Sequence, residues 1–123
     1  MKLSKSEEQL MELIWKHEKV FMKDIIAGYP DPKPAGTTIA TLLKRMQDKG
    51  FVGYNTLGNS RQYYALVKKS AYFSKEVNGI IKNYFNDSAL QFASFFTSSS
   101  NITPDELEDL KKIIDQEIER RAK

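Results

Sequence analysis

The 123-residue chain has no cysteine, one histidine and one tryptophan. The lack of cysteine excludes disulfides and thiolate metal sites. No apolar run approaches the length of a membrane helix, and the first ten residues, MKLSKSEEQL, lack the apolar segment of a signal peptide. We therefore expect no membrane insertion and a location in the cytoplasm.

Features that support catalysis are also scarce. The six glycines form neither a GxGxxG motif nor a phosphate-binding loop, and no group of His, Asp and Glu has the spacing of metal ligands. His17 stands alone near the end of the first expected helix, where a histidine is usually a surface residue. We predict that the protein is not an enzyme and that it uses no cofactor and no metal.

The residues that are present suit a globular protein with a charged N-terminal part. The apolar share is 41 %, and seven phenylalanines and six tyrosines can supply a core. Residues 1–70 carry 12 basic against 7 acidic residues, whereas residues 71–123 carry 7 against 9. This asymmetry favours an anionic partner for the first part, although an excess of this size also occurs by chance.

The first half of the chain shows signals for helices joined by a short strand. Ser4-Lys5-Ser6-Glu7 fits a capping box, and Gly50 suits a left-handed cap after a helix. YPDPKPAG is a proline-rich loop between two helices. The expected order is helix, strand, helix and helix, at residues 5–18, 20–21, 23–29 and 37–49.

A hairpin follows directly. Residues 51–56 and 61–67 are rich in β-formers on either side of a turn at Gly58-Asn59. A third helix that leads into a hairpin is the order of a winged helix-turn-helix, in which that helix enters the major groove. We assign residues 1–69 to a winged-helix DNA-binding domain.

The third helix has two different faces. Ile39, Leu42, Leu43 and Met46 form an apolar face, and threonines and basic residues occupy the rest. Hydroxyl and basic side chains can meet phosphates and base edges, and the hairpin tip is small and polar or basic. The alternative is a merely solvated face. The predicted DNA-binding residues are Thr37, Thr38, Thr41, Lys44, Arg45, Asn59 and Arg61.

The second half predicts three helices with large apolar stripes. They lie at residues 71–85, around residues 90–96, and from Thr103-Pro104-Asp105-Glu106 onward, with a polar loop at residues 97–101 between the last two. Three such helices bury little in a monomer, so residues 70–123 are expected to dimerise; folding back onto one monomer is the alternative. The predicted dimerisation residues are Ile80, Ile81, Tyr84, Phe92, Phe95, Leu107, Leu110, Ile114 and Ile118.

The chain resembles the penicillinase-repressor family, the BlaI/MecI-type transcriptional repressors. The resemblance covers nearly the whole chain, and its carriers are SKSEEQLMELIWK, TTIATLLKRMQDKGFV, RQYYALV and ITPDELEDLKKIID. It implies a mainly α fold with a small β-hairpin, an N-terminal winged helix and a C-terminal helical dimerisation region. It also implies repression at a two-fold symmetric operator, with Thr37, Thr38, Thr41 and Arg45 on the recognition helix and Arg61 on the wing.

Two departures from the family concern induction. In well-known members, signalling by a membrane sensor leads to cleavage at an Asn-Phe pair in the C-terminal region, but residues 90–96 read LQFASFF and contain no such pair. The paired cysteines of the copper-responsive branch are also missing. An inducing protease would therefore cut another bond, or induction differs.

We predict a homodimeric repressor that binds double-stranded operator DNA, controls antibiotic-resistance-type or related genes, and is induced by loss of dimerisation. One alternative is a winged-helix regulator that responds to a small ligand. Another is a winged-helix protein-interaction module that does not bind DNA.

Overall fold

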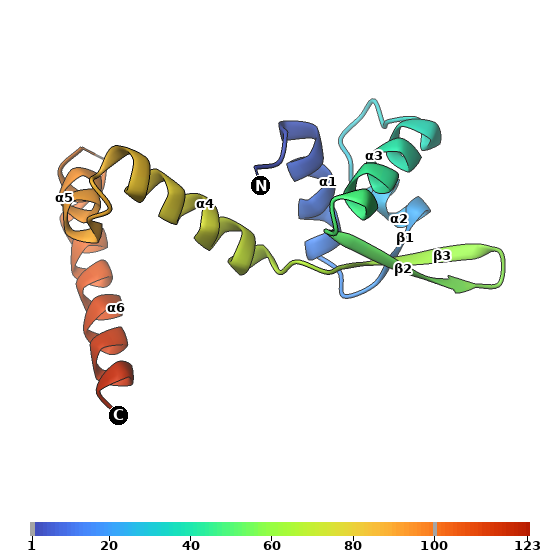
Figure 1. Cartoon of the computed structure of the whole chain (residues 1–123). Helices are drawn as coiled ribbons and strands as arrows, with labels where there is room; N and C mark the ends of the chain where they lie inside the picture. The colour runs from blue at the N-terminus through green and yellow to red at the C-terminus, as the bar shows by residue number, and fades with distance from the viewer. Residues whose placement is uncertain (1, 100) are drawn as a thin grey trace. The chain divides into compact units, whose positions relative to one another are not determined.

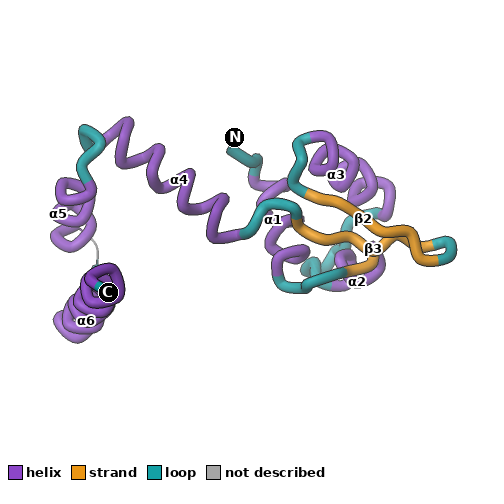
Figure 2. Tube along the Cα trace, turned by 60° about the horizontal axis from the view of Figure 1, so that its bottom comes forward, coloured by secondary structure: helices purple, strands orange, loops and turns teal. Residues whose placement is uncertain are grey.

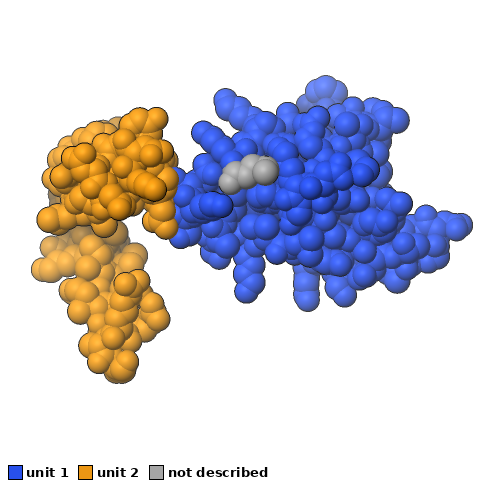
Figure 3. All heavy atoms as spheres, in the orientation of Figure 1, with its two compact units in different colours: residues 1–76 blue, residues 77–123 orange. Residues whose placement is uncertain are grey.

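The computed structural model describes residues 2–99 and 101–123. The chain forms two compact units, residues 1–76 and 77–123, which are described separately below (Figure 3). The boundary lies within helix α4 (Lys69–Tyr84). The division into two functional domains at residue 70 stays a prediction.

The first unit has the predicted winged helix-turn-helix arrangement. Its elements are α1 (Lys5–Trp15), β1 (Val20–Phe21), α2 (Met22–Ala27), α3 (Gly36–Asp48), β2 (Val52–Leu57), β3 (Ser60–Ala65) and the first half of α4 (Figure 1). The three strands form an antiparallel sheet in the order β1-β3-β2, and the β2–β3 hairpin projects beyond the helices (Figure 2).

Local hydrogen bonds explain where the main helices begin and end. The Ser4 hydroxyl accepts from the Glu7 amide at 3.3 Å, and the Glu7 carboxylate accepts from the Ser4 amide at 2.8 Å, which confirms the capping box. After α3, the Phe51 amide donates to the Met46 carbonyl and the Gly50 amide donates to the Gln47 carbonyl. Gly50 has a φ of 80°, so this is the predicted left-handed glycine cap.

The apolar stripes of α1 and α3 meet in one core. The four inner residues of α3 are buried, and they pack with residues of α1, α2, the sheet and α4. The buried side chains are Leu3, Leu10, Met11, Ile14, Val20, Ile25, Tyr29, Ile39, Leu42, Leu43, Met46, Phe51, Val52, Tyr63 and Tyr72. This core fixes α3 against α1 and the sheet, and so positions the outer face of α3.

Two helices of the first unit end earlier than the sequence suggested. α1 ends at Trp15 instead of residue 18, and residues 16–19 turn so that Val20 can pair with Tyr63 of β3. α2 covers Met22–Ala27 instead of residues 23–29. Gly28 caps α2, and Tyr29 leaves the helix to join the core.

The second unit contains the rest of α4 with α5 (Ala89–Ser99) and α6 (Pro104–Ala122). Asn86 and Asp87 have positive φ angles and interrupt the chain between α4 and α5. The Ser88 hydroxyl then accepts from the Gln91 amide at 3.1 Å, as expected for a helix cap. α6 begins with the predicted capping box of Thr103 and Glu106.

The polar loop expected at residues 97–101 is shorter than predicted. α5 continues through Ser99, because the hydroxyls of Thr97 and Ser98 donate to the Ala93 and Ser94 carbonyls one turn back, at 2.8 and 2.7 Å. This bonding lets serine and threonine remain helical. Ser100, also placed in the loop by the sequence, lies outside the described residues.

The second unit has almost no core of its own. None of the described residues from 77 to 123 is buried. Phe85 contacts Phe92 and Phe95, with ring centroids 5.4 and 5.3 Å apart, but most apolar side chains are open to solvent. The exposed large apolar residues are Val77, Ile80, Tyr84, Leu90, Phe95, Phe96, Leu107, Ile113, Ile114 and Ile118.

Candidate DNA-binding surface

The outer face of α3 is polar and internally hydrogen-bonded. The Thr41 hydroxyl donates to the Thr37 carbonyl at 2.9 Å, which leaves its methyl group and the lone pairs of its oxygen available. One turn further on, Lys44 Nζ lies 2.8 Å from Asp48 Oδ1 in an exposed i,i+4 pair. Exposed pairs of this kind are weak, so Lys44 can exchange Asp48 for a phosphate.

The hairpin places one basic side chain next to α3. Thr56 of β2 pairs with Arg61 of β3, and the turn between them contains Gly58 with a φ of 61°. The Arg61 guanidinium carbon lies 4.2 Å from the centroid of the Tyr54 ring. A cation over an aromatic ring is held in place without losing its charge, so Arg61 is oriented and still cationic.

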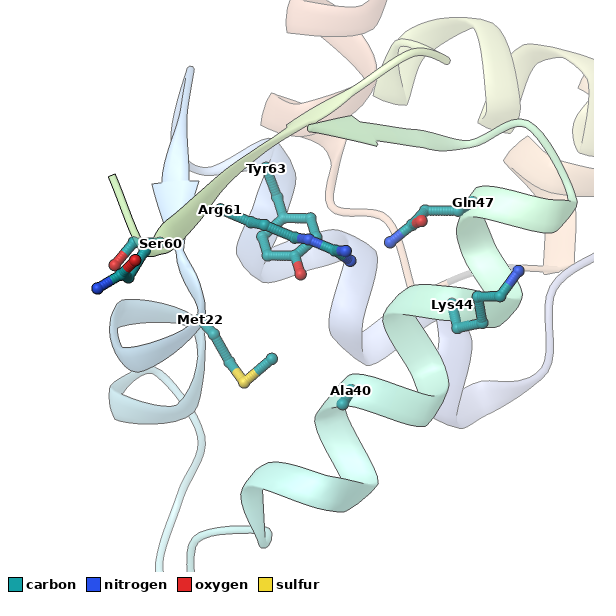
Figure 4. A pocket seen from close by; sticks show the side chains of 8 residues that line it. Met22, Ala40, Lys44, Gln47, Ser60, Arg61 and Tyr63 are labelled. Carbon is teal, nitrogen blue, oxygen red and sulfur yellow. The ribbon is translucent and has the colours of Figure 1, made fainter. Parts of the chain in front are cut away.

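A groove of about 440 Å³ separates α3 from the hairpin (Figure 4). It brings together three of the predicted DNA-binding residues, Lys44, Asn59 and Arg61. In Figure 4 the Lys44 and Gln47 side chains come from α3, and Arg61 comes from the opposite wall. The other lining residues are Met22, Ala40, Gln47, Ser60 and Tyr63.

Some of these lining residues were missed by the sequence analysis. Ala40 and Gln47 stand four before and three after Lys44, so helical periodicity places them on the same side as Lys44 and would have found them. Met22 and Tyr63 carry no such signal. They reach the groove because β1 pairs with β3 next to the start of α2.

The remaining predicted residues do not line this groove. Thr37 and Thr41 lie on the exposed face of α3. Thr38 lines a separate hollow of about 260 Å³, with residues of α1 and the proline-rich loop. Arg45 faces α1, with its Nη1 atom 3.9 Å from Glu7 Oε2.

Glu7 supplies the strongest electrostatic feature next to α3. Its Oε2 atom lies 2.7 Å from Lys49 Nζ, at the C-terminal cap of α3. Burial by itself raises the pKa of a carboxyl group, but hydrogen bonds from Lys49 and Ser4 outweigh it, so the pKa of Glu7 lies below its ordinary value of 4.5. Glu7 is therefore an anion that compensates charge on one flank of α3.

The described residues offer no metal site and no membrane helix. Among them, no three His, Asp or Glu side chains come close enough to hold a metal ion. None of the helices formed by residues 2–99 and 101–123 combines the length and apolar character that crossing a membrane requires. The surface suits binding of a polyanion by hydroxyl, amide and basic side chains.

The predicted dimerisation residues lie on the second unit. Six of the nine are exposed, as noted above, and Ile81, Phe92 and Leu110 are partly covered. Phe96, Ile102, Leu110 and Ile113 also line a hollow of about 370 Å³ with Glu106 and Asp109. The structure contains one chain, so their part in an interface stays a prediction.

Comparisons with known proteins match almost the whole chain. The family model described as "Penicillinase repressor" matches residues 3–116. The chain is 29 % identical over 119 residues to the methicillin resistance regulatory protein MecI of Staphylococcus aureus (strain N315), covering 93 % of this chain and 94 % of the relative. It is 21 % identical over 120 residues to the penicillinase repressor of Bacillus licheniformis, covering 97 % and 94 %.

A solved structure matches the winged helix. The solution structure of the DNA-binding domain of the repressor BlaI aligns with a TM-score of 0.51 and 26 % sequence identity, covering 58 % of this chain and 88 % of that one. The resemblance inferred from the helix and hairpin motifs is thereby confirmed. The chain belongs to the penicillinase repressor family, a family of DNA-binding transcriptional repressors and not of enzymes.

Proposed function

We propose that the protein is a homodimeric repressor that binds a two-fold symmetric operator. The observation that carries this proposal is the groove between α3 and the hairpin, where Lys44 and Arg61 stand on opposite walls with Asn59 at the tip. A phosphate backbone that passes along the hairpin would meet both cations while α3 enters the major groove.

Thr37 and Thr41 are proposed to face the bases. They lie on the exposed face of α3, and their methyl groups suit the thymine methyl group in the major groove. Thr38 and Arg45 lie on the flank of α3 that faces α1, so any contact they make with DNA would be at that flank. Arg45 is partly compensated by Glu7, so we assign it a smaller part than Lys44 and Arg61.

Dimerisation is proposed to occur through the second unit. None of its described residues is buried, and α6 carries a row of exposed isoleucines. Both support this, because stripes of this kind normally pack against another helix. A dimer binds the second half-site at a high effective concentration, so its affinity for an operator exceeds that of a monomer. Loss of the dimer would release the operator without any change in α3.

The regulated genes are proposed to be of the β-lactam-resistance type, because relatives are named as a methicillin resistance regulator and as a penicillinase repressor. Induction is proposed to act on dimerisation. Since α5 contains Leu90-Gln91-Phe92-Ala93-Ser94-Phe95-Phe96 and no Asn-Phe pair, an inducing protease would have to cut a different bond.

Selection of bound duplexes from a random pool tests the proposal directly. We expect an inverted repeat whose half-site centres lie about 10 base pairs apart or a multiple of it. Binding to the selected duplex should weaken steeply with added salt. Enrichment of a single asymmetric site would contradict the dimeric mode, and no enrichment at any salt concentration would contradict DNA binding itself.

A further inference from the structure

Glu7 is an unusual residue in the first unit. Among the residues that the structure describes, it is the single charged residue that is buried, with a side chain only 3 % exposed. Charged side chains are rarely buried unless they are paired. Its position in the first turn of α1 is explained by the capping box, but its burial against α3 is not.

The two cationic partners of Glu7 come from α3 and its C-terminal cap. Lys49 Nζ lies 2.7 Å from Glu7 Oε2, and Arg45 Nη1 lies 3.9 Å from the same oxygen. Lys49 and Arg45 are four residues apart, so they occupy one flank of α3. Their side chains remain 29 % and 49 % exposed, which means that each could turn toward solvent if the carboxylate were neutral.

The capping box does not require a carboxylate at this position. A capping box functions with either Glu or Gln three residues after the cap. A buried ion pair is also weak evidence for stability, because the cost of desolvating two charges offsets most of their attraction. A neutral glutamine could form the same capping box, so the capping box does not by itself explain the negative charge.

The charge balance along α3 supplies a reason. Lys44 and Arg45 lie in its second half and Lys49 at its C-terminal cap. Lys44 pairs with Asp48, and the other two pair with Glu7. Lys49 lies five residues after Lys44, so the two side chains leave the helix in different directions. An uncompensated Lys49 that came within the Debye length of about 8–10 Å of a phosphate would add to the attraction of any DNA backbone.

We propose that Glu7 is a specificity-determining residue, which acts by keeping Lys49, and in part Arg45, from phosphates of non-operator DNA. Phosphate contacts raise affinity for every sequence alike, whereas base contacts separate one sequence from another. By holding one flank of α3 close to neutral, Glu7 leaves the phosphate contacts to Lys44 and Arg61 at the groove. This inference rests on the proposed DNA-binding function.

The test compares two glutamine variants of α1. Glu7→Gln keeps the capping geometry and releases Lys49. The matched control, Glu12→Gln, makes the same charge change in the same helix and also releases a lysine, because Glu12 Oε2 lies 3.0 Å from Lys69 Nζ in an exposed pair. Each full-length variant is titrated with the selected operator duplex and with a scrambled duplex of equal length, over a series of salt concentrations.

For Glu7→Gln we expect tighter binding to the scrambled duplex, by roughly 3–10-fold at low salt, and a smaller change for the operator. The salt dependence of scrambled-duplex binding should steepen by about 0.9 for each cation that gains a phosphate. Glu12→Gln should change the affinity for the scrambled duplex and its salt dependence less than Glu7→Gln does. If Glu7→Gln weakened binding to the operator and to the scrambled duplex by the same factor, the role of Glu7 would be merely structural and the proposal would be overturned. Equal changes in affinity and salt dependence for Glu7→Gln and Glu12→Gln would also overturn it.

Two further variants identify the cation. Adding Lys49→Gln to Glu7→Gln should return the salt dependence to that of the unchanged protein. Lys49→Gln alone should leave the salt dependence unchanged, because Glu7 already holds Lys49. A decrease of about 0.9 in the salt dependence of this variant would mean that Lys49 binds a phosphate, and would overturn the proposal. This test remains decisive even if Glu7→Gln does not fold. If the unchanged protein shows no salt-dependent binding to either duplex, the proposed function itself fails, a result distinct from all of these.

Discussion

The Tyr72 hydroxyl accepts a hydrogen bond from the backbone amide of Leu3 at 2.9 Å, so the first turn of α4 is bonded to the chain just before α1. The same hydroxyl donates to Glu8 Oε2 at 3.0 Å. Nearby, Trp15 Nε1 donates to the Val67 carbonyl at 2.9 Å. The start of α4 is therefore part of the winged-helix unit, seven residues beyond the boundary that the sequence suggested for it.

Tyr72→Phe should lower the free energy of unfolding by about 1–2 kcal/mol, because it leaves the Leu3 amide without a partner in a buried site. Urea unfolding followed by far-UV circular dichroism measures this difference. Tyr54→Phe is the control, since Tyr54 is 38 % exposed and its ring would remain beneath Arg61; we expect a change of less than about 0.5 kcal/mol. Equal losses for both variants would contradict a specific role for the Tyr72 hydroxyl.

Substitution by alanine should have opposite effects at the two glycines that stand at the start of α3 and just after its end. Gly50 has a φ of 80° in the cap after α3, and although a Cβ would meet no atom within 4 Å, the left-handed backbone disfavours it. Gly50→Ala should cost about 1–2 kcal/mol of stability. Gly36→Ala, at an open position in the first turn with no positive φ, should be neutral or stabilise by up to about 1 kcal/mol.

Thermal unfolding of both variants checks this pair. A loss of stability in Gly36→Ala as large as that in Gly50→Ala would mean that the cap geometry does not explain the requirement for glycine.

Acid should expose the contribution of Glu7. The pKa of its carboxyl group is lower in the folded chain than its ordinary value of 4.5, because Lys49 and Ser4 outweigh the effect of burial. The unfolded state therefore takes up the proton first as the pH falls, so the stabilisation is complete above pH 4.5 and is lost as the pH passes through the lowered pKa.

The measurement is the free energy of unfolding in urea at several pH values. Glu7→Gln should show a shallower loss of stability than the unchanged protein as the pH falls below 4.5. Parallel curves for the two proteins would contradict the lowered pKa of Glu7.

Features that depend on neighbours in the sequence could be predicted. The two capping boxes, at Ser4 with Glu7 and at Thr103 with Glu106, and the turn at Gly58 each involve residues within a few positions of one another. The same holds for the apolar face of α3, which follows from helical periodicity. The winged helix could be recognised because its elements also occur in the right order.

Features that depend on packing between distant segments could not be predicted. Glu7 and Lys49 are 42 residues apart, and nothing local in either segment indicates that α1 and α3 bring them together. For the same reason the sequence assigned Arg45 to the DNA-binding set with no sign that it faces a carboxylate. The groove residues Met22 and Tyr63 depend likewise on the pairing of β1 with β3.

The two cations at the groove should contribute to DNA binding without regard to sequence. Lys44→Ala and Arg61→Ala should each weaken binding to operator and scrambled duplexes by similar factors, and each should reduce the salt dependence by about 1. Lys82→Ala, an exposed lysine in the last turn of α4, is the control and should leave both unchanged. A loss confined to the operator would show that the altered residue reads bases and does not bind phosphate.

The exposed stripe of α6 should control the oligomeric state. Ile114 is 50 % exposed beside Ile113 and Ile118, so Ile114→Asp would place a charge within the proposed interface and should give monomers in analytical ultracentrifugation. Gln116→Asp makes the same change in charge on the opposite side of the helix and should leave the dimer intact. The monomer should also bind the operator far more weakly than the dimer, while its affinity for an isolated half-site stays the same. A dimer that survives Ile114→Asp would move the interface away from α6, and a monomer that keeps full operator affinity would separate repression from dimerisation.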